Sequence, residues 1–170
     1  GDGSEQENAA ELDKEAIADE LKRLENYSAL AKSIKRNSKG ENLLMALKRG
    51  FELAGELGGC RKAVIFTESR RTQEYLFNLL SENGYRDKIV FLNGTNSDKD
   101  SQTIYQEWKR RHDGDEAISG SKSADLKAAI VEEFRDRAEI LIGTEAAAEG
   151  INLQFCSLVV NYDMPWNPQR

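Results

Sequence analysis

Polar residues that could bind a ligand gather in one short turn, directly after an apolar run at Ile140–Ile142. Thr144 and Glu145 open the turn, three alanines follow, and Gly150 and Asn152 close it. Because alanines pack tightly, the hydroxyl of Thr144, the carboxylate of Glu145 and the amide of Asn152 are left as the exposed polar groups. A glycine also lets the backbone pass close to a neighbour or a ligand. The turn therefore predicts a binding site.

Short apolar runs alternate with amphipathic segments through the last two thirds of the chain, and this alternation predicts the elements that position the turn. Each run is too short and too uniformly apolar for a half-exposed strand, so we expect strands buried on both faces of a parallel sheet. The expected strands are 63–67, 89–92, 140–142 and 158–160, and the expected helices are 71–83, 97–111 and 123–137. Strand–helix alternation predicts an α/β layer fold with right-handed crossovers, in which ligands bind at the carboxyl ends of the strands.

The first third of the chain has a different pattern. Apolar residues three or four apart predict an amphipathic helix over residues 10–37 and a second one over residues 41–57, with a break at residues 37–40. The first eight residues are polar, which is typical of disorder or of a vector-derived tail. We therefore expect a disordered or vector-derived tail at residues 1–9, a helical extension at 10–58 and an α/β domain at 59–170.

Composition limits the classes of function. The net charge of −6 and the pI near 5.0 argue against a free-standing nucleic-acid binder, which usually carries a basic surface. Cys60 and Cys156 have no metal-binding spacing and His112 is the only histidine, so we expect neither a metal site nor a disulfide framework. A soluble, cytoplasmic protein fits these features.

Two segments near residue 115 imitate ATP-binding motifs. Gly114–Ser123 resembles a phosphate-binding loop, but its spacing is one residue too long and no apolar strand precedes it. Asp115 and Glu116 imitate a magnesium-binding acidic pair, which would have to stand at the end of an apolar strand. We interpret both as parts of a polar surface loop.

The turn at Ile140–Gln154 resembles motif V of superfamily 2 helicases. The run Asp163–Gln169 is similar to the approach to motif VI in Swi/Snf-related ATPases, and Val64–Arg70 is similar to motif IV. Phe91–Thr95 and Lys39–Leu44 also resemble segments of that lobe, so the resemblance covers roughly residues 38–170. It implies the RecA-like C-terminal lobe of a two-lobed motor protein, with a parallel sheet flanked by helices.

The resemblance implies a role for each matching residue. Thr144, Ser69 and Arg70 would contact the nucleic-acid backbone, with Asn93 and Gly94 nearby. Hydroxyl, amide and guanidinium groups suit phosphate oxygens and do not read base sequence. Simpler structural alternatives remain open: Thr144 could cap its turn, and Ser69 with Arg70 could begin a helix.

The resemblance also implies ATP and Mg²⁺ as cofactors, bound mainly by a first RecA-like lobe on the same polypeptide. Gly150, Asn152 and Glu145 would line the cleft between the lobes, where Asn152 could reach the ribose; an aspartate often stands at this place in related helicases. The arginines of motif VI are expected just beyond Arg170. We therefore expect no ATP hydrolysis by these 170 residues alone.

Two other classes of function stay open. A non-catalytic module that docks a protein partner agrees with the acidic pI, and a small stand-alone α/β enzyme is disfavoured because the chain offers no nucleophile paired with a base. The expected partner is DNA or RNA, with DNA favoured, and we expect no membrane association and a monomeric chain. Trp166 is expected in loop or core packing.

Overall fold

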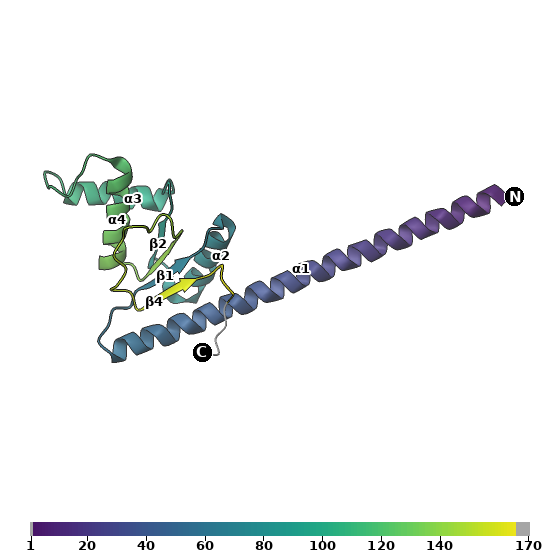
Figure 1. The fold of residues 1–170 in the computed structure, drawn as a ribbon, viewed down its shortest axis with the longest axis horizontal. Coiled ribbons are helices and arrows are strands. Elements are labelled where there is room, and N and C mark those ends of the chain that lie inside the picture. Colours follow the sequence, from purple (N-terminus) through teal and green to yellow (C-terminus); the bar gives the residue numbers. More distant parts are fainter. Residues whose placement is uncertain (1, 166–170) are drawn as a thin grey trace. The chain divides into compact units, whose positions relative to one another are not determined.

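The computed structural model describes residues 2–165, and the side chains from Gly3 onward. The chain divides into two compact units, residues 1–41 and residues 42–170. In order, the elements are α1 (Asp2–Glu56), β1 (Ala63–Phe66), α2 (Arg70–Leu80), the π-helical turn η1 (Ser81–Tyr85), β2 (Ile89–Leu92), α3 (Lys99–Arg111), α4 (Lys122–Asp136), β3 (Ile140–Gly143) and β4 (Leu158–Asn161). Figure 1 labels these elements.

The four strands form one all-parallel sheet in the order β2-β3-β1-β4. This arrangement confirms the predicted α/β class, the predicted strands and the predicted helices between them. The expectation that every strand is buried on both faces is wrong for β4, where Val159 is 54% exposed. The reason is position, because β4 lies at the edge of the sheet and no helix of the crossover from β3 covers it.

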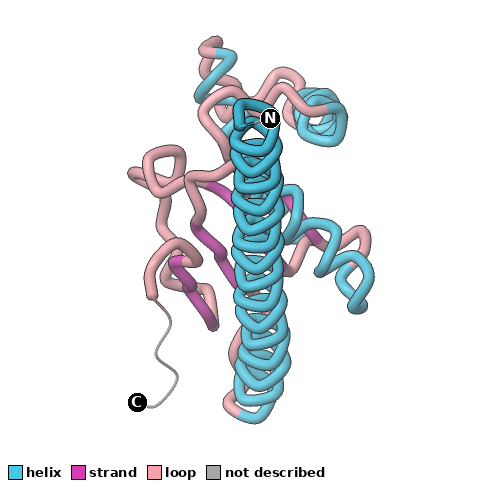
Figure 2. The backbone as a smooth tube through the Cα atoms, turned by 90° about the vertical axis from the view of Figure 1, so that its right-hand side faces the viewer, coloured by secondary structure: helices cyan, strands magenta, loops and turns pink. Residues whose placement is uncertain are grey.

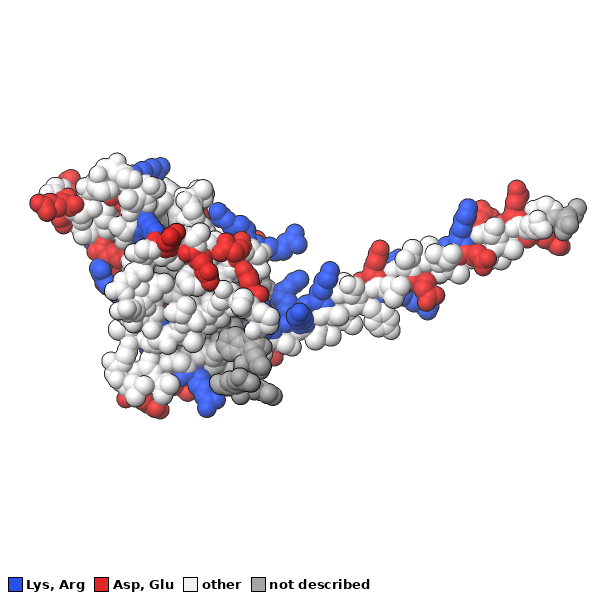
Figure 3. Space-filling model, in the orientation of Figure 1, with Lys and Arg blue, Asp and Glu red and all other residues white. Residues whose placement is uncertain are grey.

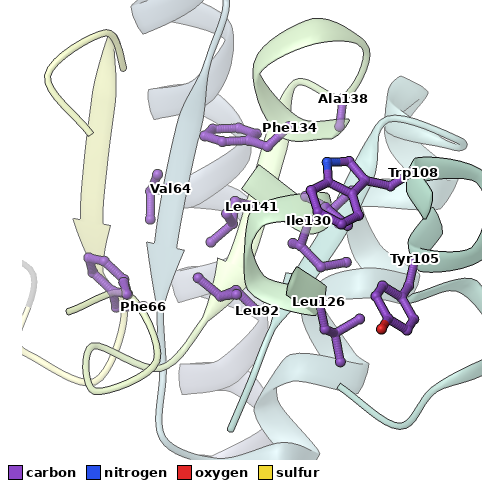
Figure 4. Packing of buried hydrophobic residues seen from close by; sticks show 13 residues of the cluster. Val64, Phe66, Leu92, Tyr105, Trp108, Leu126, Ile130, Phe134, Ala138 and Leu141 are labelled. Atoms are coloured by element: carbon purple, nitrogen blue, oxygen red, sulfur yellow. The ribbon is translucent and has the colours of Figure 1, made fainter. Parts of the chain in front are cut away.

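Helices cover both faces of the sheet in residues 42–165, as the strands and helices of Figure 2 show. On one face, α3 and α4 bury residues such as Trp108, Ile130 and Phe134 against Val64 and Leu141. These side chains interlock in Figure 4. On the other face, α2 and the end of α1 form a second apolar cluster. Its buried members are Leu43, Leu47, Phe51, Ala63, Ile65, Leu76, Leu80, Ile140, Ile142, Val160 and Tyr162.

Helix α1 differs from the sequence-based expectation. It is one helix of 55 residues, so the predicted break at 37–40 is wrong, and residues 2–9 are helical where a disordered or vector-derived tail was expected. A glycine inside a helix costs only about 1 kcal/mol relative to alanine, and the hydrogen-bond ladder can continue through it. Leu43 and Leu47 are fully buried, so residues 42–56 belong to the α/β unit and not to a separate extension.

The loop between α3 and α4 is a series of turns, as the sequence predicts. It follows the end of a helix, not a strand, and the residue before α4 is its N-cap, Ser121. His112 lies at the start of the loop and contacts Glu132 of α4 at 2.9 Å and Asp115 at 3.2 Å. None of the described helices has the length and apolar content needed to cross a membrane.

Candidate nucleic-acid interface

The carboxyl ends of all four strands meet at one edge of the sheet, because the strands are parallel. A hydrogen-bond network fixes two of these ends to each other. The carboxylate of Asp163, just after β4, accepts hydrogen bonds from the hydroxyl of Thr67 at 2.7 Å and the amide N–H of Glu68 at 2.9 Å, both just after β1. This network holds the segment that leads into α2.

The turn after β2 is fixed by a buried amide network. Asn93 is only 9% exposed, and its Oδ1 accepts a hydrogen bond from Nε2 of Gln73 at 2.9 Å. Its backbone N–H donates to Oδ1 of Asn96 at 2.7 Å. Asn93 therefore positions the turn, and the residues that the turn exposes are Gly94 and Thr95.

A groove of about 460 Å³ lies where this turn approaches the start of α4 and the turn after β3. Its lining brings together Gly94, which the sequence predicts, with Thr95, Lys122, Ser123 and Lys127, which were not predicted. Lysines supply positive charge to phosphate oxygens. The missed lysines gave no motif signal, and only their approach to the β2 turn marks them.

The groove includes the first residues of helix α4, whose N–H groups have no partner within the helix. Ser121 caps the helix by accepting from the N–H of Ala124. Asp125 accepts hydrogen bonds from both the hydroxyl and the amide of Ser119, and these bonds hold the pKa of Asp125 below its usual range. A helix start fixed in this way favours an anion through its dipole and its N–H groups.

Thr144 and Ser69 both act as local caps. The hydroxyl oxygen of Thr144 accepts from the N–H of Ala147 at 3.2 Å, and that of Ser69 accepts from the N–H of Thr72 at 3.2 Å. Each hydroxyl keeps a proton that it can donate to a phosphate oxygen, so capping and backbone contact are compatible. Thr144 is half-buried beside the groove-lining Ala147, whereas Ser69 is exposed at the start of α2.

Arg70 lies in a neighbouring groove of about 770 Å³. The groove is shared with Arg71, Phe77 and Phe91, and Asn93 lines both grooves. The Arg70 guanidinium donates a long hydrogen bond of 3.4 Å to the hydroxyl of Thr95. This contact joins the two grooves through exposed side chains, which places Arg70 next to the β2 turn as the sequence predicts.

The three residues predicted to face ATP are exposed but do not form one cluster. Glu145 accepts from the side-chain amide of Asn161 at 2.8 Å, while Asn152 accepts locally from the N–H of Gln154 at 3.1 Å. Gly150 has a φ of +81°, which explains the glycine. No neighbour lies within 4 Å of a Cβ built there, so the expected close approach is not made within the described chain.

The close approach occurs at Gly143 instead, the last residue of β3. A Cβ there would collide with the carbonyl oxygen of Leu92 on β2. This glycine lets two strands approach directly below the groove. The sequence does not distinguish this glycine from a turn residue, because it stands at the end of an apolar run.

The chain is similar in sequence to several known proteins. Residues 115–170 match the family described as helicase conserved C-terminal domain. A Bacillus subtilis protein named uncharacterized ATP-dependent helicase YqhH is 38% identical over 109 residues, which is 64% of this chain and 14% of that protein. The ATP-dependent RNA helicase DeaD of Escherichia coli K12 is 29% identical over 100 residues, 58% of this chain and 15% of DeaD.

The ATP-dependent RNA helicase DBP2 of Saccharomyces cerevisiae S288c is 32% identical over 105 residues, covering 60% of this chain and 18% of DBP2. The chain thus spans less than a fifth of the length of each of these three relatives. Over more than half of its own length it is similar to ATP-dependent helicases, and its helix-flanked parallel sheet is consistent with a RecA-like helicase C-terminal domain.

Proposed function

We propose that this chain is the second motor lobe of an ATP-dependent helicase or double-strand translocase of the Swi/Snf-related type, and that its groove holds the nucleic-acid backbone. One observation carries the proposal: Lys122, Lys127, Thr95 and the start of α4 surround a groove at the carboxyl edge of the sheet. The lysines neutralise phosphates, and the hydroxyl and helix N–H groups donate hydrogen bonds to them. The run Asp163–Gln169, whose residues from Trp166 lie outside the described part of the chain, supports the Swi/Snf-related type.

Backbone contacts of this kind do not read base sequence. The relatives named as RNA helicases make RNA a partner to test beside the favoured DNA. Ser69, Arg70 and Thr144 extend the basic and hydroxyl-bearing surface on both sides of the groove. We expect these residues to bind the same strand.

ATP and Mg²⁺ fit this chain only in part. Glu145 is an exposed carboxylate that would repel a triphosphate but can accept hydrogen bonds from ribose hydroxyls, and Asn152 offers an amide for the same purpose. Gly150 shapes the turn between them through its positive φ. The phosphates and Mg²⁺ would then be held by a first lobe, and closure of the two lobes would move their contacts along the nucleic-acid backbone.

Fluorescence anisotropy with labelled 20-nucleotide single strands and duplexes, of both DNA and RNA, tests the backbone groove. Lys122→Ala and Lys127→Ala should each weaken binding on every sequence and lower the slope of log affinity against log salt by about 0.7 to 0.9. Lys48→Ala, on the exposed surface of α1 away from the groove lining, is the matched control and should leave both quantities unchanged. Equal effects of all three substitutions would contradict binding of the nucleic-acid backbone in this groove.

Calorimetric titration with Mg-ATP tests whether the first lobe is needed to bind ATP. We expect no binding tighter than millimolar and no ATP hydrolysis by this chain. Micromolar binding would show that the first lobe is not needed, and would leave the backbone groove to be judged by the anisotropy result.

A further inference from the structure

One face of helix α1 within residues 1–41 exposes a row of large apolar side chains. Leu24 is 61% exposed and Tyr27 is 71% exposed, and Ile17 and Leu21 are more than half exposed. Residues three, four or seven apart share a face of an α-helix. Single exposed apolar residues are ordinary on a surface, but a continuous stripe marks an interaction site.

Four exposed apolar side chains lie at matching distances on the two sides of Leu24. Leu21 and Tyr27 lie three residues before and after it, and Ile17 and Ala31 lie seven residues before and after it. All of these side chains are exposed. A helix face with apolar side chains at equal distances on both sides of its centre can pack on a second copy turned around by a twofold axis.

The ends of the same face carry opposite charges. Asp13 lies eleven residues before Leu24 and Lys35 eleven residues after it, and eleven residues are about three helical turns. The charges follow this division beyond the stripe, with seven acidic side chains and one lysine in residues 5–20 and six basic side chains and one acidic in residues 22–39. Figure 3 shows red side chains along the N-terminal part of α1 and blue ones gathering further along it.

We propose that α1 pairs with α1 of a second copy of this chain, antiparallel, about a twofold axis at Leu24. In this pairing Leu24 meets Leu24, Leu21 meets Tyr27, Ile17 meets Ala31 and Asp13 meets Lys35. A parallel pair would place acidic residues against acidic residues and basic against basic, which is unfavourable. The exposed stripe thus favours a dimer over the monomer expected from the sequence.

Charge complementarity and the matching apolar positions together identify the partner of this face as a second copy of the chain. A partner of different sequence would need neither the repeat of apolar positions on both sides of Leu24 nor the change of charge sign at its centre. The paired face is about 33 Å long from Asp13 to Lys35, which is a small interface, so the dimer should be weak and reversible.

Sedimentation equilibrium of the 170-residue chain at concentrations up to about 100 µM tests the dimer. We expect a monomer–dimer equilibrium that Leu24→Asp abolishes while circular dichroism shows the α/β unit still folded. A monomer at every concentration would overturn the proposal.

A charge exchange tests the antiparallel arrangement. Asp13→Lys alone and Lys35→Asp alone should each weaken dimerisation by about tenfold or more, because each creates two like-charged pairs. The double variant Asp13→Lys with Lys35→Asp should return to within about threefold of the parent chain. Asp19→Lys with Lys22→Glu, about 140° and 160° around the helix from Leu24, is the matched control and should change little.

Zero-length carbodiimide coupling gives a direct readout of the pairing. Asp13 and Lys35 are separated by about 33 Å within one helix, so a covalent link between them joins two chains. Mass spectrometry should find this link in the dimer fraction. A dimer that lacks it, or that the double charge exchange fails to restore, would refute the antiparallel pair at Leu24.

Discussion

Replacing Gly143 by alanine is the sharpest test of how the sheet supports the groove. Gly143 ends β3, and its missing side chain leaves room for the carbonyl group of Leu92 on β2. That same carbonyl oxygen accepts a hydrogen bond from the N–H of Thr144 at 3.2 Å. A methyl group at residue 143 must push the two backbones apart at the point where both groove-forming turns begin.

The expected loss of stability follows from opposing effects. Alanine is intrinsically favoured over glycine in an ordered segment by about 0.5 to 1 kcal/mol. Overpacking against a rigid backbone atom costs about 1 to 3 kcal/mol, and weakening the Thr144–Leu92 hydrogen bond costs about 1 kcal/mol more. Gly143→Ala should therefore destabilise the α/β unit by about 2 kcal/mol.

Gly50→Ala is the matched control because it makes the same chemical change in α1. A Cβ at residue 50 would lie 3.7 Å from Cδ2 of Leu158, an ordinary contact, and the position is helical. This variant should gain up to about 1 kcal/mol. The two variants should then differ by about 3 kcal/mol in the free energy of unfolding.

Urea unfolding followed by tryptophan fluorescence measures the difference. Trp108 is buried in the α/β core, and a Trp166→Phe background leaves it as the sole tryptophan. If Gly143→Ala and Gly50→Ala have unfolding free energies within about 0.5 kcal/mol of each other, the close approach of β2 and β3 at Gly143 is wrong.

Three further predictions concern single side chains. The imidazole N–H groups of His112 donate hydrogen bonds to the carboxylates of Asp115 and Glu132, and these bonds raise the pKa of His112. Its contribution to stability should therefore be complete below about pH 6.5 and lost as the pH rises through the folded-state pKa. An NMR titration should place the imidazole midpoint above 6.5, and His112→Gln should flatten the dependence of stability on pH in that range. Burial raises the pKa of Cys156 to about 11, so iodoacetamide at pH 8.5 should modify the exposed Cys60 first. Mass spectrometry follows the two reactions, and faster modification of Cys156 would contradict its burial. Asp163→Ala removes the acceptor of two hydrogen bonds at the ends of β1 and β4, and should lower the free energy of unfolding in urea by about 1 to 2 kcal/mol. Asp136→Ala, at the C-terminal end of α4, is the control and should lower it by less than about 0.5 kcal/mol.

The pattern of apolar residues is enough to predict the layer architecture and the edge of the sheet where a ligand site should lie. Runs such as Ala63–Phe66 and Ile140–Ile142 are uniformly apolar, as expected of strands buried on both faces of a parallel sheet, and the helix patterns between the runs are strong. Parallel strands bring their carboxyl ends together by geometry alone. The positions of Thr144 and Gly94 near one edge were therefore predictable.

Which polar residues share a groove, and which have a structural role, depends on how distant segments pack in the folded chain. Lys122 and Lys127 lie far along the chain from Gly94, and no local pattern relates them, because the relation arises from packing α4 against the sheet. Asn93 was expected beside the ligand from its place after β2, whereas its hydrogen bond to Gln73 gives it a structural role. The continuity of α1 could not be predicted from residues 37–40 alone. Weak helix formers there need not end the helix when the residues beyond them are held helical by burial, and burial of Leu43 and Leu47 holds the next turns helical.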